Sequence, residues 1–303
     1  MSLTTSTTWT NLIQEVLLPR VQSVFFQNDS LFKIWAPQPH LIGDSIDWPI
    51  HYGPSTDYAG TYSEGDPAPN PNIDVILKGS VSKQPFQVSA SISKVALDYM
   101  GGNKLGLSDP VLFDIENKVK ALLNSVNVTL LASLEAAVDS TGTYGGNAIA
   151  TYSALASYES AVSGVHSISM MEDMYEALLD NDRGCDPSQL ICLMPQNQIT
   201  NHTRLVSGAS NYPLNHQSGS PTDGGRQIPG AKFNGVPIYG IPDMTDTVVL
   251  MGEKDKVAIF EARPVTIEEK SVTADEVFFL ITCNYQIALL NQAKWAKLTG
   301  VTA

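Results

Sequence analysis

The longest regular hydrophobic pattern in the chain lies within residues 108–139. Ser108-Asp109-Pro110 supplies capping side chains and then a proline, which is favoured at the first position of a helix. From there to Ala137 the spacing predicts one amphipathic helix of about thirty residues, roughly 45 Å long. A coiled-coil dimer would use the same stripe, but the regular flanking charge pairs of that class are missing. The apolar positions are Leu112, Ile115, Val119, Leu122, Val126, Leu130 and Leu134.

The C-terminal third alternates between short apolar runs and turns, which predicts the strands of one long sheet. Asn234-Gly235 favours a tight turn inside the first run. We expect Arg263-Pro264 to break a later strand, because proline removes a backbone donor. No run carries a cluster of catalytic residue types or a metal-ligand spacing. The runs are residues 233–239, 248–251, 257–260, 265–267 and 277–290.

A mixed helix and strand segment precedes these runs. Residues 154–162 and 170–180 are predicted to be helices. Leu190–Met194 is a continuous apolar run, typical of a buried strand, and we expect a helix to begin near Pro195. Residues 208–230 form a polar Gly/Ser/Pro stretch, which predicts a loop of the kind found at an interface or a pore.

Residues 51–95 contain many turn-forming residues, followed by two half-polar strands. The strands, residues 73–79 and 81–93, alternate apolar with small polar side chains, which predicts a two-stranded ribbon that projects from the body. An isolated hairpin is only marginally stable in water, so we expect the ribbon to lie on a partner surface. Packing on its own domain is the alternative that the sequence leaves open.

Residues 1–50 start polar and then carry apolar side chains at helical spacing over residues 12–25, with Pro19 kinking or ending the first group. Trp35 and the prolines after it predict an extended arm. An arm of this kind frays unless it is held in place. A neighbouring subunit and the chain's own domain are both open as the surface that holds it.

Composition narrows the classes of function. Of the 303 residues, 43% are hydrophobic, as in a globular protein, but only 16% are charged, which suggests that much of the surface is buried against another molecule. The formal net charge of −13 argues against a nucleic-acid groove, because phosphate binding needs clustered Lys and Arg. An acidic protein can still enclose DNA, as a wall that repels the phosphate groups and does not bind them.

Cys185, Cys192 and Cys283 are an odd number of cysteines without CxxC spacing. The polar start lacks the basic and apolar regions of a signal peptide, and no apolar stretch approaches 18 residues. We therefore expect an intracellular, reduced origin, with thiols buried as small hydrophobic groups. A catalytic thiol is disfavoured because no histidine stands in a recognisable motif with it.

An enzyme would have to use His166, His202, His216, Cys185 and Asp186. The three histidines do not have HExxH spacing, and we expect them to lie in loops, exposed to solvent.

Three further patterns also fall short of a site. Residues 223–226, Asp-Gly-Gly-Arg, lack the strand–loop–helix context and the Lys-Ser/Thr ending of a phosphate loop. Asp243 and Asp246 suggest a cation site, but two carboxylates in a turn are usually capping groups. Asn127 begins a glycosylation sequon that lies on the predicted long helix. We predict no catalytic, cofactor or metal site, and keep a hydrolase or nucleotide-binding enzyme as a second class.

The order of these parts resembles the major capsid proteins of tailed bacteriophages, whose fold encapsulin shells share. The resemblance runs from the polar arm through the projecting loop, the long helix and the helix–strand module to NGVPIYGIP and the hairpin around GEKDKVAIFEARPVTIEE. It covers nearly the whole chain but lies in the order of parts, not in a strict motif. It implies an α+β fold made of an N-terminal arm (1–50), an extended loop (51–95), a peripheral domain with a long spine helix and sheet (96–145 and 246–290) and an axial domain (146–245 and 291–303).

The resemblance also implies a function. It implies a structural, non-enzymatic subunit that self-assembles through pentamers and hexamers into an icosahedral shell enclosing double-stranded DNA. The implied location is the virion capsid, assembled in the host cytoplasm. The implied partners are copies of the chain, a separate scaffolding protein and a portal, with no membrane and no cofactor. Some members carry a scaffolding segment before the arm, whereas this chain begins at the arm. Either a protease has removed that segment or scaffolding is a separate protein, and the initiating Met1 favours the second. An encapsulin-like nanocompartment shell is the alternative within the same class.

Some members of this family crosslink a lysine of the extended loop to an asparagine of a neighbour. Lys78 and Lys83 lie in the matching stretch. The resemblance assigns neither a matching asparagine nor an acidic catalyst, so no crosslink is inferred.

Overall fold

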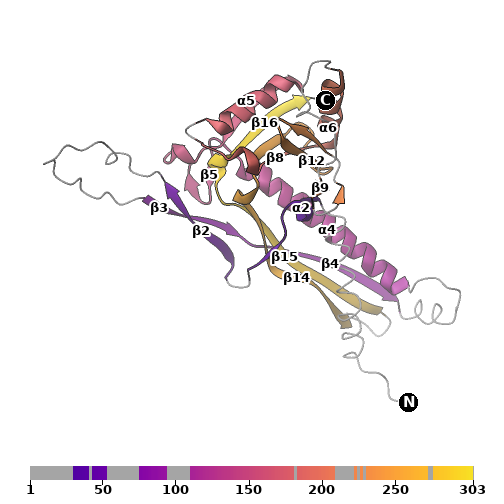
Figure 1. The fold of residues 1–303 in the computed structure, drawn as a ribbon. Helices are drawn as coiled ribbons and strands as arrows, with labels where there is room; N and C mark the ends of the chain where they lie inside the picture. Colours follow the sequence, from indigo (N-terminus) through magenta and orange to yellow (C-terminus); the bar gives the residue numbers. More distant parts are fainter. Residues whose placement is uncertain are drawn as a thin grey trace, which may run out of the picture. The chain divides into compact units, whose positions relative to one another are not determined.

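The computed structural model describes residues 30–40, 43–52, 75–93, 110–180, 183–208, 222–223, 226–227, 230–271 and 276–302 (Figure 1). The chain forms two compact units. Unit 1 comprises Met1–Asp44, Lys83–Ala132 and Ile259–Ile287; unit 2 comprises Ser45–Ser82, Ser133–Ala258 and Ala288–Ala303. The helical pattern predicted for residues 12–25, most of the predicted 208–230 loop and His216 lie outside the described residues.

Unit 1 contains a four-stranded sheet with the order β1-β14-β15-β4. β4 pairs antiparallel with β15 without a break, from Gln84 opposite Tyr285 to Ser93 opposite Glu276. β1 is parallel to β14 and pairs with it only at Phe260 and Glu261. The strands are β1 (Gln38–Pro39), β4 (Gln84–Ser93), β14 (Val257–Ser271) and β15 (Glu276–Leu289).

The predicted break at Arg263-Pro264 is wrong, because β14 continues through both residues. Among the described residues, β1 pairs with β14 only before this point, so Pro264 lies where β14 is the edge of the sheet. A proline is tolerated at an edge because the missing N–H need not serve a ladder bond there.

The predicted long helix is confirmed as α4 (Pro110–Ala137), with proline at its first position (Figure 1). Its apolar face is buried over the part whose side chains are described, as expected for a helix packed along one face. That face consists of Ile115, Val119, Leu122, Leu123, Val126, Leu130, Leu131 and Leu134.

The segment before the sheet of unit 1 packs on that unit. α2 (Ser30–Ile34) buries Phe32, whose ring meets the ring of Tyr285 edge to face at 5.4 Å. The backbone N–H of His40 donates to the carbonyl of Glu261 at 2.8 Å. For residues 30–40 the chain's own unit therefore supplies the surface that holds the predicted arm.

Unit 2 contains a six-stranded sheet with the order β11-β12-β8-β13-β16-β7. The predicted buried strand is confirmed as β8, in which every residue is buried. Parallel and antiparallel neighbours mix in this sheet, since β8 is parallel to β12 and antiparallel to β13. The strands are β7 (Tyr158–Val165), β8 (Leu190–Met194), β11 (Gly230–Phe233), β12 (Val236–Gly240), β13 (Val249–Glu253) and β16 (Trp295–Thr302).

Two predicted helices of unit 2 are confirmed as α5 (Ile168–Leu179) and α6 (Gln196–Gly208). Met171, Met174 and Leu178 of α5 and Ile199 of α6 share one apolar cluster with alternate residues of the sheet. Cys192, Ile238 and Met251 lie side by side on this face, as their strand pairing shows. Both helices therefore cover the same face of the six-stranded sheet.

The helix predicted at residues 154–162 is wrong. This segment forms a single 3₁₀ turn, Ser153–Leu155, followed by β7. β7 is an edge strand that pairs in parallel with β16, whose residues lie more than 130 positions further along the chain. The pairing with β16 decides the conformation here, and it is not visible in the local spacing of apolar residues.

The C-terminal strands belong to two sheets, so the prediction of one long sheet is wrong. β11, β12, β13 and β16 lie in the sheet of unit 2, whereas β14 and β15 lie in that of unit 1. The Asn-Gly turn is confirmed: Asn234 and Gly235 join β11 to β12 with φ angles of 46° and 85°. Positive φ at both positions is the signature of a type I′ hairpin turn.

The ribbon predicted from residues 73–79 and 81–93 does not form as such. Both segments are strands, but β3 (Val75–Ser82) pairs antiparallel with β2 (Ser45–Tyr52), and β4 pairs with β15. Only Lys83 separates β3 from β4, and a hairpin connection needs at least two residues. The observed ribbon of unit 2 is therefore β2–β3.

Candidate assembly surface

The β2–β3 ribbon has one buried and one exposed face. Ile46, Ile50 and Gly79 are buried on the inner face. On the outer face the large apolar side chain of Ile76 is 60% exposed, and it lies opposite the exposed His51. An exposed apolar side chain on a strand face is available for contact with another molecule.

The inner face depends on a glycine. A Cβ placed on Gly79 would lie 2.5 Å from Cε2 of the Trp48 ring and 2.9 Å from Cδ1 of Ile50. Trp48 lies directly opposite Gly79 in the ladder, so its ring fills the space that a side chain at position 79 would occupy. Strand glycines mark such close approaches.

A short hairpin of unit 2 holds the ribbon on the side of β3. The hairpin joins β5 (Thr143–Tyr144) to β6 (Asn147–Ala148). The carbonyl of Gly145 accepts from the N–H of Ser80 at 3.1 Å, and the side chain of Asn147 donates to the carbonyl of Lys78 at 2.9 Å. A Cβ on Gly145 would lie 2.7 Å from the Cα of Gly79. The two backbones therefore approach as closely as glycine allows.

Tyr144 also attaches the ribbon to unit 2, through a hydrogen bond with Trp48. Its hydroxyl accepts from Nε1 of Trp48 at 3.3 Å and donates to the carbonyl of Leu289 at 2.9 Å. Burial raises the pKa of the Tyr144 hydroxyl well above its usual value, so the group stays protonated and able to donate. The ribbon is thus a fixed part of unit 2 up to the ends of β2 and β3.

The outer face carries an ion pair beside Ile76. Nζ of Lys78 lies 2.9 Å from Oδ2 of Asp47, and both side chains are largely exposed. The hydrogen bond from Lys78 lowers the pKa of Asp47, with smaller contributions from Ser80 and Ser45. A shallow groove runs over this part of the ribbon; its lining is Asp47, Trp48, Pro49, Ile76, Leu77 and Lys78.

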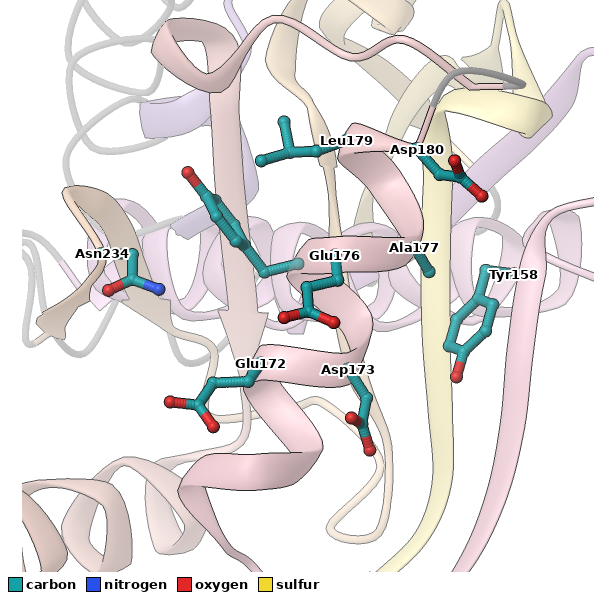
Figure 2. A pocket seen from close by; sticks show the side chains of 9 residues that line it. Tyr158, Glu172, Asp173, Glu176, Ala177, Leu179, Asp180 and Asn234 are labelled. Carbon is teal, nitrogen blue, oxygen red and sulfur yellow. The ribbon is translucent and has the colours of Figure 1, made fainter.

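The second hollow of unit 2 is an acidic groove along α5. Figure 2 shows Glu172, Asp173 and Glu176 projecting from α5, with Asp180 at the end of the helix. All four are exposed, and α5 carries no basic residue. This surface repels phosphate groups.

The candidate thiols are buried. Burial raises the pKa of Cys185 to about 11 and that of Cys283 to about 12, and it raises the pKa of Cys192 further. All three are free of disulfides. The prediction that they act as small hydrophobic groups is confirmed by their burial.

The expectation of solvated loop histidines is wrong for two of the three residues. His166, just before α5, is 2% exposed, and His202, within α6, is fully buried. Their rings meet edge to face, with Nε2 of His166 3.2 Å from Nδ1 of His202. The sequence places them 36 positions apart, so only the packing of α6 brings them together.

The other candidate residues are spread over unit 2. Asp186 accepts from the N–H and hydroxyl of Ser188, which lower its pKa, and so caps the 3₁₀ turn Pro187–Gln189. Asp243 and Asp246 are both exposed. Within residues 223–226, Asp223 pairs with Arg226 in a small hairpin, not in a phosphate loop.

Asn127 and Lys83 serve the structure of unit 1. Asn127 is 4% exposed on α4, so the sequon that it begins is inaccessible in the folded chain. Nζ of Lys83 donates to the carbonyls of His40 and Gly43 at 2.9 and 2.7 Å. The backbone N–H of Lys83 donates to the carbonyl of Asp44. These bonds hold the chain where it passes from β3 to β4.

Within the described residues, no three His, Cys, Asp or Glu side chains are grouped so that they could hold a metal ion. In the same part of the chain, no helix has both the length and the apolar character needed to cross a membrane.

Sequence comparison places the chain in no group: no family model matches it, and neither does any curated protein. Structure comparison finds the same fold in solved structures. The chain aligns with a chain of the cyanophage A-1(L) capsid asymmetric unit at a TM-score of 0.69 and 15% identity, over 90% of this chain and 93% of that one. The chain has the fold of the major capsid proteins of tailed bacteriophages.

The same capsid fold extends to particles outside the tailed phages. The chain aligns with the virus-like particle from Pyrococcus furiosus at a TM-score of 0.58 and 10% identity, covering 94% of this chain and 98% of that one. It aligns with the SrpI encapsulin of Synechococcus elongatus PCC 7942 at 0.56 and 9% identity, covering 89% and 86%. At these identities the likeness concerns the fold, and the predicted α+β capsid architecture is confirmed.

The amino-acid pattern did not predict β2 or the residues that attach it, Trp48, Gly79 and Gly145. A signal was present: within Ser45–Tyr52 the apolar side chains Ile46, Trp48 and Ile50 alternate with polar or small ones. Pro49 within this run and the proximity to the predicted arm concealed the strand.

Proposed function

We propose that this protein is a structural shell subunit, the major capsid protein of a tailed bacteriophage. It self-assembles through pentamers and hexamers into an icosahedral shell that encloses double-stranded DNA. The observation that carries this proposal is the agreement of the fold over nine-tenths of the chain and of its counterpart in a phage capsid.

The chemistry of the described residues supports a structural role. The thiols are buried, the two described candidate histidines are enclosed in the core, and the carboxylates Asp243 and Asp246 lie exposed in a turn. A catalytic site would bring such groups together around a cavity. The acidic groove on α5 and the net charge of −13 suit a wall that encloses DNA without binding it.

The parts of the fold receive proposed roles in the shell. Residues 1–50 form the arm, 51–95 the extended loop, 96–145 with 246–290 the peripheral domain, and 146–245 with 291–303 the axial domain. The β2–β3 ribbon, with Ile76 on its outer face, is the proposed contact with an adjacent subunit. The proposed further partners are a scaffolding protein and a portal, and the proposed location is the virion capsid after assembly in the host cytoplasm.

An encapsulin-like nanocompartment is the second candidate, because the chain also aligns with the SrpI encapsulin. A compartment of that kind encloses protein in place of DNA. The contents of the particle therefore distinguish the two functions.

Electron microscopy of the purified recombinant chain tests the proposal. We expect closed shells, tubes or capsomers; a uniform monomer under all assembly conditions would contradict a shell function. Particles from the native source should then be treated with nuclease and analysed for protected DNA. Protected DNA supports the phage capsid, whereas a co-purifying protein cargo without DNA supports the nanocompartment.

A matched pair of substitutions tests the ribbon as a contact surface. Ile76→Glu changes a side chain that is 60% exposed, so the stability of the subunit should change by less than about 0.5 kcal/mol. Assembly should nevertheless fall if the outer face is buried between subunits. Val165→Glu, at a strand residue that is 62% exposed, is the control on the six-stranded sheet. Equal assembly of both variants and the unmodified chain would contradict the proposed contact.

A further inference from the structure

His166 and His202 form a buried pair of titratable side chains in unit 2. His166 is 2% exposed and His202 is 0% exposed, and Nε2 of the first lies 3.2 Å from Nδ1 of the second. A hydrogen bond between the two nitrogens requires that one carries a proton and the other does not. The hydrogen bond is therefore retained while at least one of the two rings is neutral, and it is lost when both rings are protonated.

The pair joins three elements of unit 2. His166 follows the end of β7, and the backbone N–H of His166 donates to the carbonyl of Thr302 at the end of β16. Ser167, the next residue, caps α5 by accepting from the N–H of Met170. His202 lies in the middle of α6. The contact between the rings thus ties α6 to the connection between β7 and α5.

A proton added to His166 would be poorly accommodated. Nδ1 of His166 is buried and has no hydrogen-bond partner among the described residues, so the imidazolium would carry one N–H without an acceptor. Protonating a buried imidazole costs free energy, because the charged ring is kept away from water and its new N–H has no acceptor. Burial accordingly lowers the pKa of His166.

Among the described residues, the side chains found around the pair are mainly apolar or uncharged. The ring of Phe233, from β11, meets His202 edge to face at 6.2 Å, and the ring of Tyr175, from α5, meets Phe233 in turn at 6.1 Å. From α6, the side chain of Gln198 donates to the carbonyls of Val301 and Asp246. Among the described groups, the titratable side chain in contact with His166 is His202 itself, and Lys232 of β11 is exposed to solvent.

We propose that the His166–His202 pair is an acid-sensitive joint, which holds α6 on the six-stranded sheet when both rings are neutral and releases α6 when the pair is protonated. The unfolded or released segment takes up protons with the ordinary histidine value near 6.5, whereas the closed pair resists them. The released state thus binds more protons, and stability of the closed state is fully present above about pH 6.5 and declines as pH falls below it.

The size of the effect follows from proton linkage. Well below the ordinary value, each imidazole that stays neutral in the closed state changes the opening equilibrium about tenfold per pH unit; nearer that value the change is smaller. At pH 6.5 half of the released rings are already protonated, so between pH 6.5 and 5.5 we expect opening of α6 to increase about fivefold if one ring resists protonation, and about thirtyfold if both do. This inference concerns the subunit and does not depend on the proposed shell function.

Amide hydrogen exchange of the full chain between pH 5 and 8, corrected for the intrinsic rate, measures this opening. We expect the protection of peptides from α6 to fall below pH 6.5, while peptides from β8 stay protected. Protection of α6 that does not depend on pH would overturn the proposal. A parallel loss in β8 would overturn it as well, because unit 2 would then unfold as a whole.

The variant His166→Gln/His202→Asn tests the cause. The Gln and Asn amide groups lie near the positions of the two facing nitrogens, so a hydrogen bond remains without a group that titrates. In this double variant, the exchange protection of α6 should be the same at every pH between 5 and 8. If the protection instead falls below pH 6.5, as expected for the unmodified chain, the histidine pair is not the cause of the opening. His51→Gln, at an exposed position of β2, is the matched control and should keep that pH dependence.

A second measurement covers the case in which the double variant does not fold. Exchange of the imidazole C2 hydrogen, followed by mass spectrometry of the unmodified chain, gives the titration midpoint of each histidine. His166 should titrate below the ordinary value. A midpoint at or above 6.5 for His166 would overturn the proposal irrespective of any variant.

Discussion

Trp48 and Gly79 lie opposite each other in the β2–β3 ladder, and the indole ring occupies the space of the missing side chain. The same indole is hydrogen-bonded to Tyr144, which in turn bonds the carbonyl of Leu289. A single glycine therefore permits the packing that attaches the ribbon to unit 2.

Gly79→Ala should destabilise the chain by about 1–3 kcal/mol, because the new methyl group would overlap Trp48 and force it to move. Urea unfolding followed by tryptophan fluorescence measures the change. Ser82→Ala, at an exposed position near the end of the same strand, is the control and should stay within about 0.5 kcal/mol of the unmodified chain. Equal stability of the two variants would show that Trp48 does not depend on the glycine.

Gly145→Ala and Gly146→Ala separate close packing from backbone conformation. Both glycines have positive φ, 55° and 87°, so both variants bear the backbone cost of about 1 kcal/mol. Only at Gly145 would a Cβ meet another backbone, 2.7 Å from the Cα of Gly79, whereas nothing lies within 4 Å at Gly146. We expect Gly145→Ala to be the less stable variant by a further 1 to 3 kcal/mol, roughly. Thermal unfolding of the two side by side tests this, and equal melting temperatures would contradict it.

Leu122→Asp should cost several kcal/mol, roughly, because the carboxylate would be buried on the apolar face of α4 without a partner. Leu122 is 4% exposed. Asn124→Asp adds the same charge to an exposed position of the same helix and should be tolerated. Circular dichroism and thermal unfolding measure both. A soluble Leu122→Asp variant of unchanged stability would mean that this face of α4 is not packed.

Lys297→Met should destabilise unit 2 by about 1–3 kcal/mol. Nζ of Lys297 donates to the carbonyls of Glu135 and Val138 at the end of α4 and lies 3.5 Å from Glu159, and the side chain is only 15% exposed. Carbonyl groups at a helix end carry partial negative charge, which a nearby cation stabilises.

The matched control for Lys297→Met is Lys78→Met. Lys78 also forms an ion pair, at 2.9 Å, but its side chain is 69% exposed. Exposed pairs contribute about 0–1 kcal/mol at most, so urea unfolding should show little change. A larger effect at Lys78 than at Lys297 would reverse the ranking that burial predicts.

Replacing residues 53–74 with a short Gly-Ser linker should leave a folded, soluble subunit that no longer closes into shells. The replacement must end before β3, because Lys78 and Gly79 contact the β5–β6 hairpin and belong to the fold of unit 2. Circular dichroism and size-exclusion chromatography on one sample separate the outcomes. Normal particles would contradict the role of this loop in assembly, and an unfolded subunit would assign the loop to the core.

The sequence by itself predicted the elements whose pattern is local. α4 follows from a stripe with the helical period and a proline at its start, β8 from a continuous apolar run, and the β11–β12 turn from Asn234-Gly235. In each, the residues that determine the conformation lie within one or two turns of each other. The order of these elements was sufficient to suggest the capsid fold.

Only the tertiary structure decided which strands pair and which side chains meet. β7 is a strand because it lies beside β16, and β3 pairs with β2 because one residue cannot turn the chain from β3 into β4. His166 and His202 are buried for the same reason, since their environment is made by α6 packing on a sheet whose strands are distant in sequence. Pairing across long separations depends on the global arrangement of the chain, and no local period encodes it.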